Sequence, residues 1–439
     1  MTKKIILCIV AVLFGFNNTS IFIGDVQIRL FHIFGAFLVA SVINDFMIKK
    51  GQKVDSSRSI TRWLLFKENG YSIFVMSIWF IYALISFLWI QSVPDWQLAI
   101  GFFVIGIFCV IVFSLFLKTR EDLFQTFQIM GVVAIVHNII GWYEVLTQDH
   151  LFADPERWGN RPVSVFYNTN NFAVFLFFSV FILYALAESN KNSYLKNFYK
   201  ISAASSAILI YLTESRGVLL GLIIGLTILT ALSNIDKFKI NAKSFFRSVA
   251  LMFLIAIATV SISSTVVDLF ATDVAISVSH ADRIALIKNG FAFLLETNGF
   301  GVGAGNIEHW MENYYHFNLV AQYNIRNMHN WWAEILAGYG IIIFSLYVGF
   351  YYKLIKNNLI KFHNSENQVD VALSKAMICI MGGFLIASAV PSTLVFHIFH
   401  WVFWAVAIAF QGTCQAVPET AIAPQEAQQL ALTKLYENS

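Results

Sequence analysis

The sequence predicts an all-α polytopic membrane protein, and three observations point to this class. Hydrophobic residues make up 58% of its 439 residues and charged residues 13%, whereas soluble globular chains carry about 25% charged residues. Apolar runs of the length that crosses a bilayer recur along the chain. Basic residues are concentrated in alternate connections between these runs, as expected when lysine and arginine stay on one side of a membrane.

About twelve apolar runs are long enough to be transmembrane helices. We expect nine helices in residues 1–270, an outward-facing loop at 271–331, three more helices at 332–412 and a cytoplasmic tail at 413–439. No small-residue cleavage site follows the first run, so we interpret it as an uncleaved span. The expected spans are roughly 5–23, 28–48, 70–92, 97–117, 126–147, 170–188, 200–214, 217–232, 248–270, 332–352, 371–391 and 394–412.

Charge distribution predicts the orientation. With the N-terminus in the cytoplasm, 22 of the 29 basic residues face the cytoplasm, which agrees with the positive-inside rule. Both termini are then cytoplasmic, and the loop 271–331 faces the periplasm or the cell exterior. The outer segments hold 6 Arg and 1 Lys. Because the planar guanidinium binds phosphate and carboxylate in a bidentate manner, this bias predicts an anion site on the outer face.

Two arginines outside the loop 271–331 are candidates for that site. Arg216 lies between the seventh and eighth spans in Glu214-Ser-Arg-Gly217, which we interpret as a hairpin tip at the outer face. A salt bridge with Glu214 is the structural alternative. Arg161 lies in the loop before the sixth span, where Asn168 could cap the helix. For Arg157, in the same loop, a surface charge is an equally good interpretation.

The segment from Asp282 to Leu295 is expected to form an amphipathic helix on the outer surface. Its apolar residues at 284, 287, 291, 294 and 295 have helical spacing. Arg283 would lie in the first turn, where the helix dipole disfavours a cation. The arginine therefore needs another reason to be there, which supports a role in anion binding.

The glycine-rich run Gly299-Phe-Gly-Val-Gly-Ala-Gly305 predicts a flexible or tightly turned loop close to a ligand. No strand precedes it, so a dinucleotide-binding unit is not indicated. Four metal-ligating residues follow at helical spacing, but such sets arise easily by chance, and we expect no metal. They are Glu308, His309, Glu312 and His316.

His329 and the residues after it lie at the outer end of the tenth span. Histidine is a natural general base near neutral pH, although a lone histidine more often makes a structural hydrogen bond. The indoles that follow could stack on sugars or belong to an interfacial aromatic belt. We take Asn330, Trp331, Trp332 and Glu334 as candidate glycan-binding residues.

Taken in order, these motifs resemble the O-antigen ligase and Wzy-type polysaccharide polymerase superfamily, over roughly residues 155–345. The residues that carry the resemblance are Ser215-Arg-Gly, Asp282-Arg, the Gly-x-Gly-x-Gly-Asn run and the segment His329-Asn-Trp-Trp-Ala-Glu-Ile-Leu. The last motif is most similar to polymerases of capsular, exopolysaccharide or teichuronic-type polymers. The resemblance implies a GT-C type glycosyltransferase that uses neither metal nor cofactor. It also implies that Arg216 and Arg283, with Arg161 nearby, bind the diphosphate of the donor and that His329 activates the acceptor hydroxyl.

The function we expect is polymerisation of a polysaccharide in the bacterial cytoplasmic membrane. The growing glycan would pass from undecaprenyl diphosphate to the non-reducing end of a lipid-linked repeat unit. A ligase that transfers the glycan to lipid A–core is the alternative, and a transporter or flippase is a more distant one, because the candidate charges cluster at one membrane face. The expected partners are the lipid-linked oligosaccharide, membrane lipid, and a flippase and chain-length regulator of the export pathway. Nucleic acid is not expected.

Overall fold

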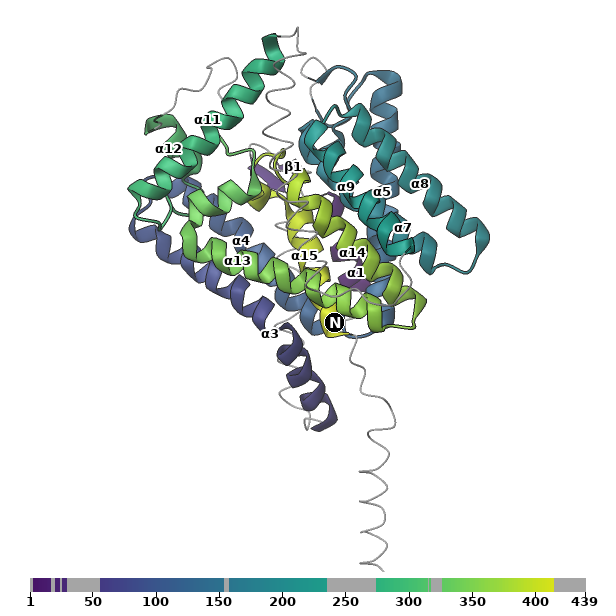
Figure 1. Ribbon diagram of the computed structural model, residues 1–439. Coiled ribbons are helices and arrows are strands. Elements are labelled where there is room, and N and C mark those ends of the chain that lie inside the picture. Colours follow the sequence, from purple (N-terminus) through teal and green to yellow (C-terminus); the bar gives the residue numbers. More distant parts are fainter. Residues whose placement is uncertain are drawn as a thin grey trace, which may run out of the picture.

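A computed structural model describes residues 3–16, 20–23, 26–29, 56–153, 158–234, 274–314, 316 and 326–413. The described part is almost entirely helical (Figure 1). Its α-helices are α1 (Lys3–Gly15), α3 (Ser56–Ile85), α4 (Val93–Phe116), α5 (Arg120–Thr147), α7 (Thr169–Ser189), α8 (Ser193–Leu212), α9 (Arg216–Asn234), α11 (Val274–Glu296), α12 (Ile307–Asn313), α13 (Trp331–Asn364), α14 (Gln368–Ala387) and α15 (Ile398–Gly412). Short 3-10 turns lie at η1 (Ser86–Leu88), η2 (Ser164–Phe166) and η3 (Leu394–Phe396).

Among the described residues, seven helices are long and apolar enough to cross a membrane: α3, α4, α5, α7, α9, α13 and α14. The chain is thus a multi-pass membrane protein. The predicted span at 248–270 and most of that at 28–48 lie outside the described residues. The described helix of the last predicted span, α15, is an apolar helix of 15 residues.

The first predicted span is wrong in its second half. Helix α1 ends at Gly15, and strands β1 (Ser20–Ile23) and β2 (Val26–Arg29) form an antiparallel ribbon. The intervening sequence, Asn17-Asn-Thr-Ser20, explains the early end, because these side chains compete for backbone hydrogen bonds and disfavour helix. The all-α class therefore holds for the described residues apart from this ribbon.

The helices form two groups joined by central ones (Figure 1). Helices α3, α4 and α13 lie on one side and carry α11 and α12 at their upper end, while α5, α7, α8 and α9 lie on the other. Helix α14 packs against α7, α9 and α13 and so joins the two groups. A Cβ on Gly221 of α9 would lie 2.7 Å from the carbonyl oxygen of Gly383 of α14. Glycine therefore allows the close backbone approach typical of membrane helices.

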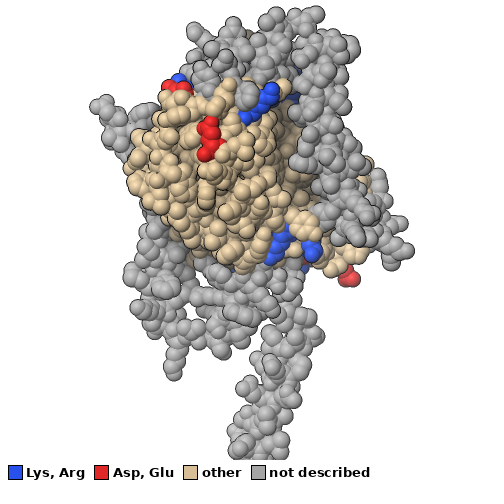
Figure 2. Space-filling view, turned by 60° about the vertical axis from the view of Figure 1, so that its left-hand side comes forward, with Lys and Arg blue, Asp and Glu red and all other residues tan. Residues whose placement is uncertain are grey.

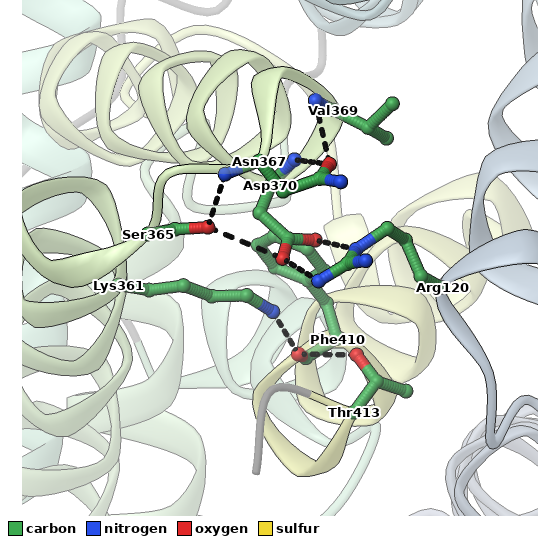
Figure 3. A network of polar contacts seen from close by, with 8 residues as sticks. All are labelled: Arg120, Lys361, Ser365, Asn367, Val369, Asp370, Phe410 and Thr413. Atoms are coloured by element: carbon green, nitrogen blue, oxygen red, sulfur yellow. Dashed lines mark hydrogen bonds and ion pairs between the residues drawn. The ribbon is translucent and has the colours of Figure 1, made fainter. Parts of the chain in front are cut away.

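Polar contacts gather at two opposite ends of the bundle. At one end, Arg120 of α5 makes a bidentate ion pair with Asp370 of α14, with Nε to Oδ1 at 3.0 Å and Nη2 to Oδ2 at 2.7 Å (Figure 3). Lys361 of α13 donates to the carbonyl oxygen of Phe410 nearby (Figure 3). On the face drawn in Figure 2, charged side chains lie toward the upper and lower edges, with a broad uncharged band between them. Such a band is what a bilayer-embedded surface requires.

Candidate functional site

The candidate residues meet at the connection between α14 and α15, at the end of the bundle opposite Arg120. The Nδ1 atom of His329 lies 3.1 Å from the carbonyl oxygen of Val390 in this connection. The hairpin tip that carries Arg216 packs against the same residue, since a Cβ on Gly217 would lie 2.1 Å from Cγ2 of Val390. Val390 thus joins two candidates that are far apart in the sequence.

The hydrogen bond to Val390 determines the tautomer of His329. A carbonyl oxygen can only accept, so Nδ1 carries the proton, and Nε2 of the neutral ring keeps its lone pair. Burial lowers the pKa of His329, and the positive charge of Arg283 lowers it further, while the bond to Val390 partly opposes this shift. The ring is therefore neutral near pH 7, with Nε2 available as a base.

Arg283 lies in the middle of α11 rather than at its start, because the helix begins at Val274. The dipole argument that supported Arg283 therefore fails. The side chain is half-buried, and burial lowers the pKa of its guanidinium. It has no hydrogen bond or ion pair with any residue that the structure describes. A buried guanidinium without a protein partner is suited to binding an anion.

The buried face of α11 also differs from the predicted one. Leu286 and Phe293 are fully buried, whereas Phe291 and Leu295 of the predicted apolar face are 53% and 77% exposed. The helix approaches the site through Gly290, where a Cβ would lie 2.6 Å from Cε of Met328. This contact places α11 against the residue that precedes His329.

Arg216 begins α9 and is exposed. Its expected structural alternative, a salt bridge with Glu214, is wrong, because Glu214 lies 3.7 Å from Arg161 instead. Within the described ranges the guanidinium of Arg216 has no ion-pair or hydrogen-bond partner. The tip is fixed from below by Ser215, whose Oγ donates to Oδ1 of Asn170 at 2.8 Å. The charge is thus presented on a rigid turn.

Arg161 is held near the hairpin tip by a well-anchored loop. The carboxylate of buried Glu144 accepts from the backbone N–H groups of Val163 and Ser164, both at 2.8 Å. Asn168 caps α7 as predicted, accepting from the two N–H groups of the first turn. The ion pair of Arg161 with Glu214 is largely exposed, with side-chain exposures of 39% and 71%, and holds the arginine only weakly. Arg157 lies outside the described residues.

Comparison with known proteins identifies the family. A family profile described as O-antigen ligase matches residues 201–348. The teichuronic acid biosynthesis protein TuaE of Bacillus subtilis (strain 168) is 32% identical over 363 residues, which cover 80% of this chain and 73% of that protein. The chain belongs to the O-antigen ligase and Wzy-type polymerase family. It is therefore a membrane enzyme of polysaccharide synthesis, of a family that handles lipid-linked glycan.

The region that matches the O-antigen ligase profile contains Arg216, Arg283 and His329, whereas Arg161 precedes it. It also contains the glycine-rich run, and here the structure differs from the expectation of a loop against a ligand. The run packs on α13 at a kink where Gly340 has φ +75. The kink frees the carbonyls of Ala337 and Gly338, which accept from the N–H groups of Val302 and Gly303, both at 2.9 Å. The close approach is therefore to another backbone.

The aromatic and polar residues after His329 occupy different environments in this family member. Trp331 is 1% exposed, and its Nε1 donates to the hydroxyl of Tyr347 at 2.9 Å, so its indole packs in the core. Trp332 is half-buried. The side chain of Asn330 caps α13. Glu334 is 5% exposed and lines a cavity. Trp332 and Glu334 thus stay candidates for glycan binding, whereas Trp331 and Asn330 have structural positions.

The four residues at metal-compatible spacing do not converge. His316 contacts Glu296, and Glu312 lies 2.9 Å from Nη1 of Arg326. Among the described residues no three His, Cys, Asp or Glu side chains are arranged to hold a metal ion. Sequence reasoning missed Val390, Asp95 and Tyr339, which lie at or beside the site. No local pattern marks them, because each approaches His329 or Glu334 from another part of the chain.

Proposed function

We propose that the protein is a polysaccharide polymerase of GT-C type that uses no metal. It transfers the growing glycan from undecaprenyl diphosphate to the non-reducing end of a lipid-linked repeat unit. The relative named for teichuronic acid biosynthesis supports a role in making a glycan. One observation carries the proposal: a neutral His329 with a free Nε2 lies near a buried, unpaired Arg283 and shares Val390 with the tip that bears Arg216.

The reaction follows from this arrangement. Nε2 of His329 takes the proton of an acceptor hydroxyl, whose oxygen forms the new bond to the anomeric carbon of the donor glycan. The bond between that carbon and the diphosphate oxygen breaks, and undecaprenyl diphosphate leaves with the electron pair. Arg216 and Arg283 stabilise the negative charge that develops on the leaving group, and Arg161 adds a third cation at the edge.

The outer side of the cytoplasmic membrane is the expected place of this reaction, with both termini in the cytoplasm and 271–331 as the catalytic loop. Residues predicted to be outside the membrane, Arg161, Arg216 and His329, lie at the end of the bundle opposite the Arg120–Asp370 pair. An accessibility map tests the orientation. A cysteine at position 214 should react with an impermeant thiol reagent in intact cells, and one at position 121 should not.

Analysis of glycan intermediates tests the reaction. In cells lacking the gene, a wild-type copy should restore a polymer ladder, and His329→Ala should leave lipid-linked single repeats. Arg216→Lys and Arg283→Lys should reduce polymer formation about a hundredfold, because a point charge does not reproduce the bidentate guanidinium. Arg326→Lys is the matched control, since this arginine already pairs with Glu312. Near-normal ladders in both lysine variants of the site would refute the assignment.

The ligase alternative is supported by the description of the matching family profile. The same gel distinguishes it, because a missing ligase leaves a full ladder on the lipid carrier, whereas a missing polymerase leaves single repeats. Substrate flux in proteoliposomes without a new glycosidic bond would instead indicate a transporter or flippase.

A further inference from the structure

A cavity lined by carboxylates lies beside His329. Asp95 of α4, Glu308 of α12 and Glu334 of α13 line it, together with Tyr339 of α13. Met328, the residue before His329, forms part of its wall. The arginines discussed above do not line this cavity, so its chemistry is opposite to that of the anion site.

The polar groups of this cavity are incompletely satisfied by the protein. Tyr339 is 3% exposed, and its hydroxyl has no hydrogen-bond partner among the residues that the structure describes. Glu334 is 5% exposed and receives the backbone N–H of Leu394, which leaves acceptor capacity on its carboxylate. A buried hydroxyl and a buried carboxylate without full partners are costly unless a bound molecule supplies the missing hydrogen bonds.

The arrangement of the carboxylates favours a ligand with many hydroxyl groups over a cation. In the described ranges they do not gather into a group that could hold a metal ion. They come from separate helices and approach the cavity from different sides. Spread acceptors of this kind match the hydroxyl donors of a sugar, and a phenolic hydroxyl such as that of Tyr339 can donate or accept. A uronate would meet like charges here.

The cavity and the anion site lie on different sides of His329. Helices α4 and α12, which supply Asp95 and Glu308, belong to one side of the molecule, whereas α9, which begins with Arg216, belongs to the other (Figure 1). His329 is placed between them by its bond to Val390 and by the wall position of Met328. A base in this position can serve a hydroxyl from one side and a leaving group on the other.

We propose that this carboxylate cavity binds the terminal, uncharged sugar of the acceptor glycan and directs its hydroxyl toward His329. The proposal rests on the polymerase function above and adds the acceptor subsite and its selectivity. Asp95, Glu308 and Glu334 accept hydrogen bonds from the sugar, and Tyr339 supplies the remaining donor or acceptor. The donor diphosphate stays with the arginines.

Steady-state kinetics with two separate substrates test this subsite. The full-length protein in liposomes receives its lipid-linked repeat as donor. The acceptor is the soluble repeat oligosaccharide, released from the carrier by mild acid and labelled at its reducing end. Tyr339→Phe and Glu308→Gln should each raise the KM for the soluble acceptor about fivefold to tenfold, the effect of one lost hydrogen bond. The KM for the lipid-linked donor should stay unchanged. Tyr339→Phe removes a hydroxyl that has no described protein partner, so folding should be unaffected.

Two controls make the outcome decisive. Glu296→Gln removes a carboxylate of the same outer region that contacts His316 and does not line the cavity, and it should change neither KM. An acceptor whose terminal primary hydroxyl is oxidised to a carboxylate should be a poor substrate for the wild type. If the wild type polymerises but both variants keep the acceptor KM, or the oxidised acceptor is used as readily as the neutral one, the subsite is refuted alone. A wild type without transfer overturns the polymerase function, and the subsite with it.

Discussion

Substitution of Gly217 by alanine perturbs the site without removing any reactive group. The new Cβ would lie 2.1 Å from Cγ2 of Val390, whereas carbon atoms in contact are about 3.5–4.0 Å apart. The start of α9 or Val390 must therefore move by roughly 1.5 Å. Val390 is branched at Cβ and has few rotamers with which to avoid the clash. Its backbone carbonyl holds Nδ1 of His329, so the displacement reaches the base.

The expected magnitude follows from the size of this displacement. A misplacement of about 1 Å in a reacting group can reduce the rate about a hundredfold. We therefore expect Gly217→Ala to lower kcat for polymerisation by about that factor in proteoliposomes. Val390→Ala removes Cγ2, so the double variant Gly217→Ala/Val390→Ala should regain most of the activity.

A matched control separates this contact from a general effect of alanine in a helix. A Cβ on Gly101 of α4 would meet no heavy atom of another described element within 4 Å, so Gly101→Ala should retain normal activity. Thermal unfolding of each purified variant shows whether it is folded. Equal activity of Gly217→Ala and Gly101→Ala would refute the reasoning. So would a folded double variant that stays inactive.

Further predictions concern pH, stability and the loop that carries the glycine-rich run. Because His329 must be neutral and its pKa is lowered from 6.5, activity should persist below pH 6.5 and fall as the pH drops through the lowered pKa. Arg283→Gln removes a charge that lowers this pKa, so the acidic limb of the residual rate should move to higher pH, whereas Arg283→Lys should leave it in place. Arg120→Met leaves the carboxylate of Asp370, only 3% exposed, without its guanidinium, and should lower the free energy of unfolding by about 2–3 kcal/mol. Denaturant unfolding in detergent should show Arg120→Met/Asp370→Asn to be more stable than Arg120→Met, and the opposite order would contradict the unpaired-charge explanation. Gly340→Ala would place a Cβ 2.3 Å from the carbonyl oxygen of Gly299 and should make the loop 297–305 more susceptible to protease than in the wild type. Unchanged cleavage would show that the kink does not hold the loop.

Several features of the site could be predicted from local sequence. Asn168 was expected to cap the helix that follows, and its side chain does so. The turn around Arg216 was expected from two apolar runs that nearly touch, and α8 and α9 are joined there by a short connection. Such features depend on a few neighbouring residues, because capping and tight turns are made by groups that are adjacent in the chain.

Other features depended on contacts between distant segments. The glycine-rich run was expected to approach a ligand, but it binds the kinked backbone of α13. Glu214 was expected to be a partner of Arg216 and instead pairs with Arg161. Trp331 was expected to stack on sugars and is buried. Each outcome was decided by a partner that no local pattern identifies.

The sequence by itself determined that the chain is a membrane protein, where several of its helices run, and to which family it belongs. It did so because bilayer thickness and the cost of unpaired polar groups in lipid restrict a spanning segment to a long apolar helix. Only the tertiary structure decided which apolar faces are buried, as α11 shows: Phe291 is exposed and Phe293 is buried. In a membrane an apolar side chain can face lipid or protein at similar cost, so periodicity alone does not select the packed face. The position of His329 against Val390 likewise required the folded bundle.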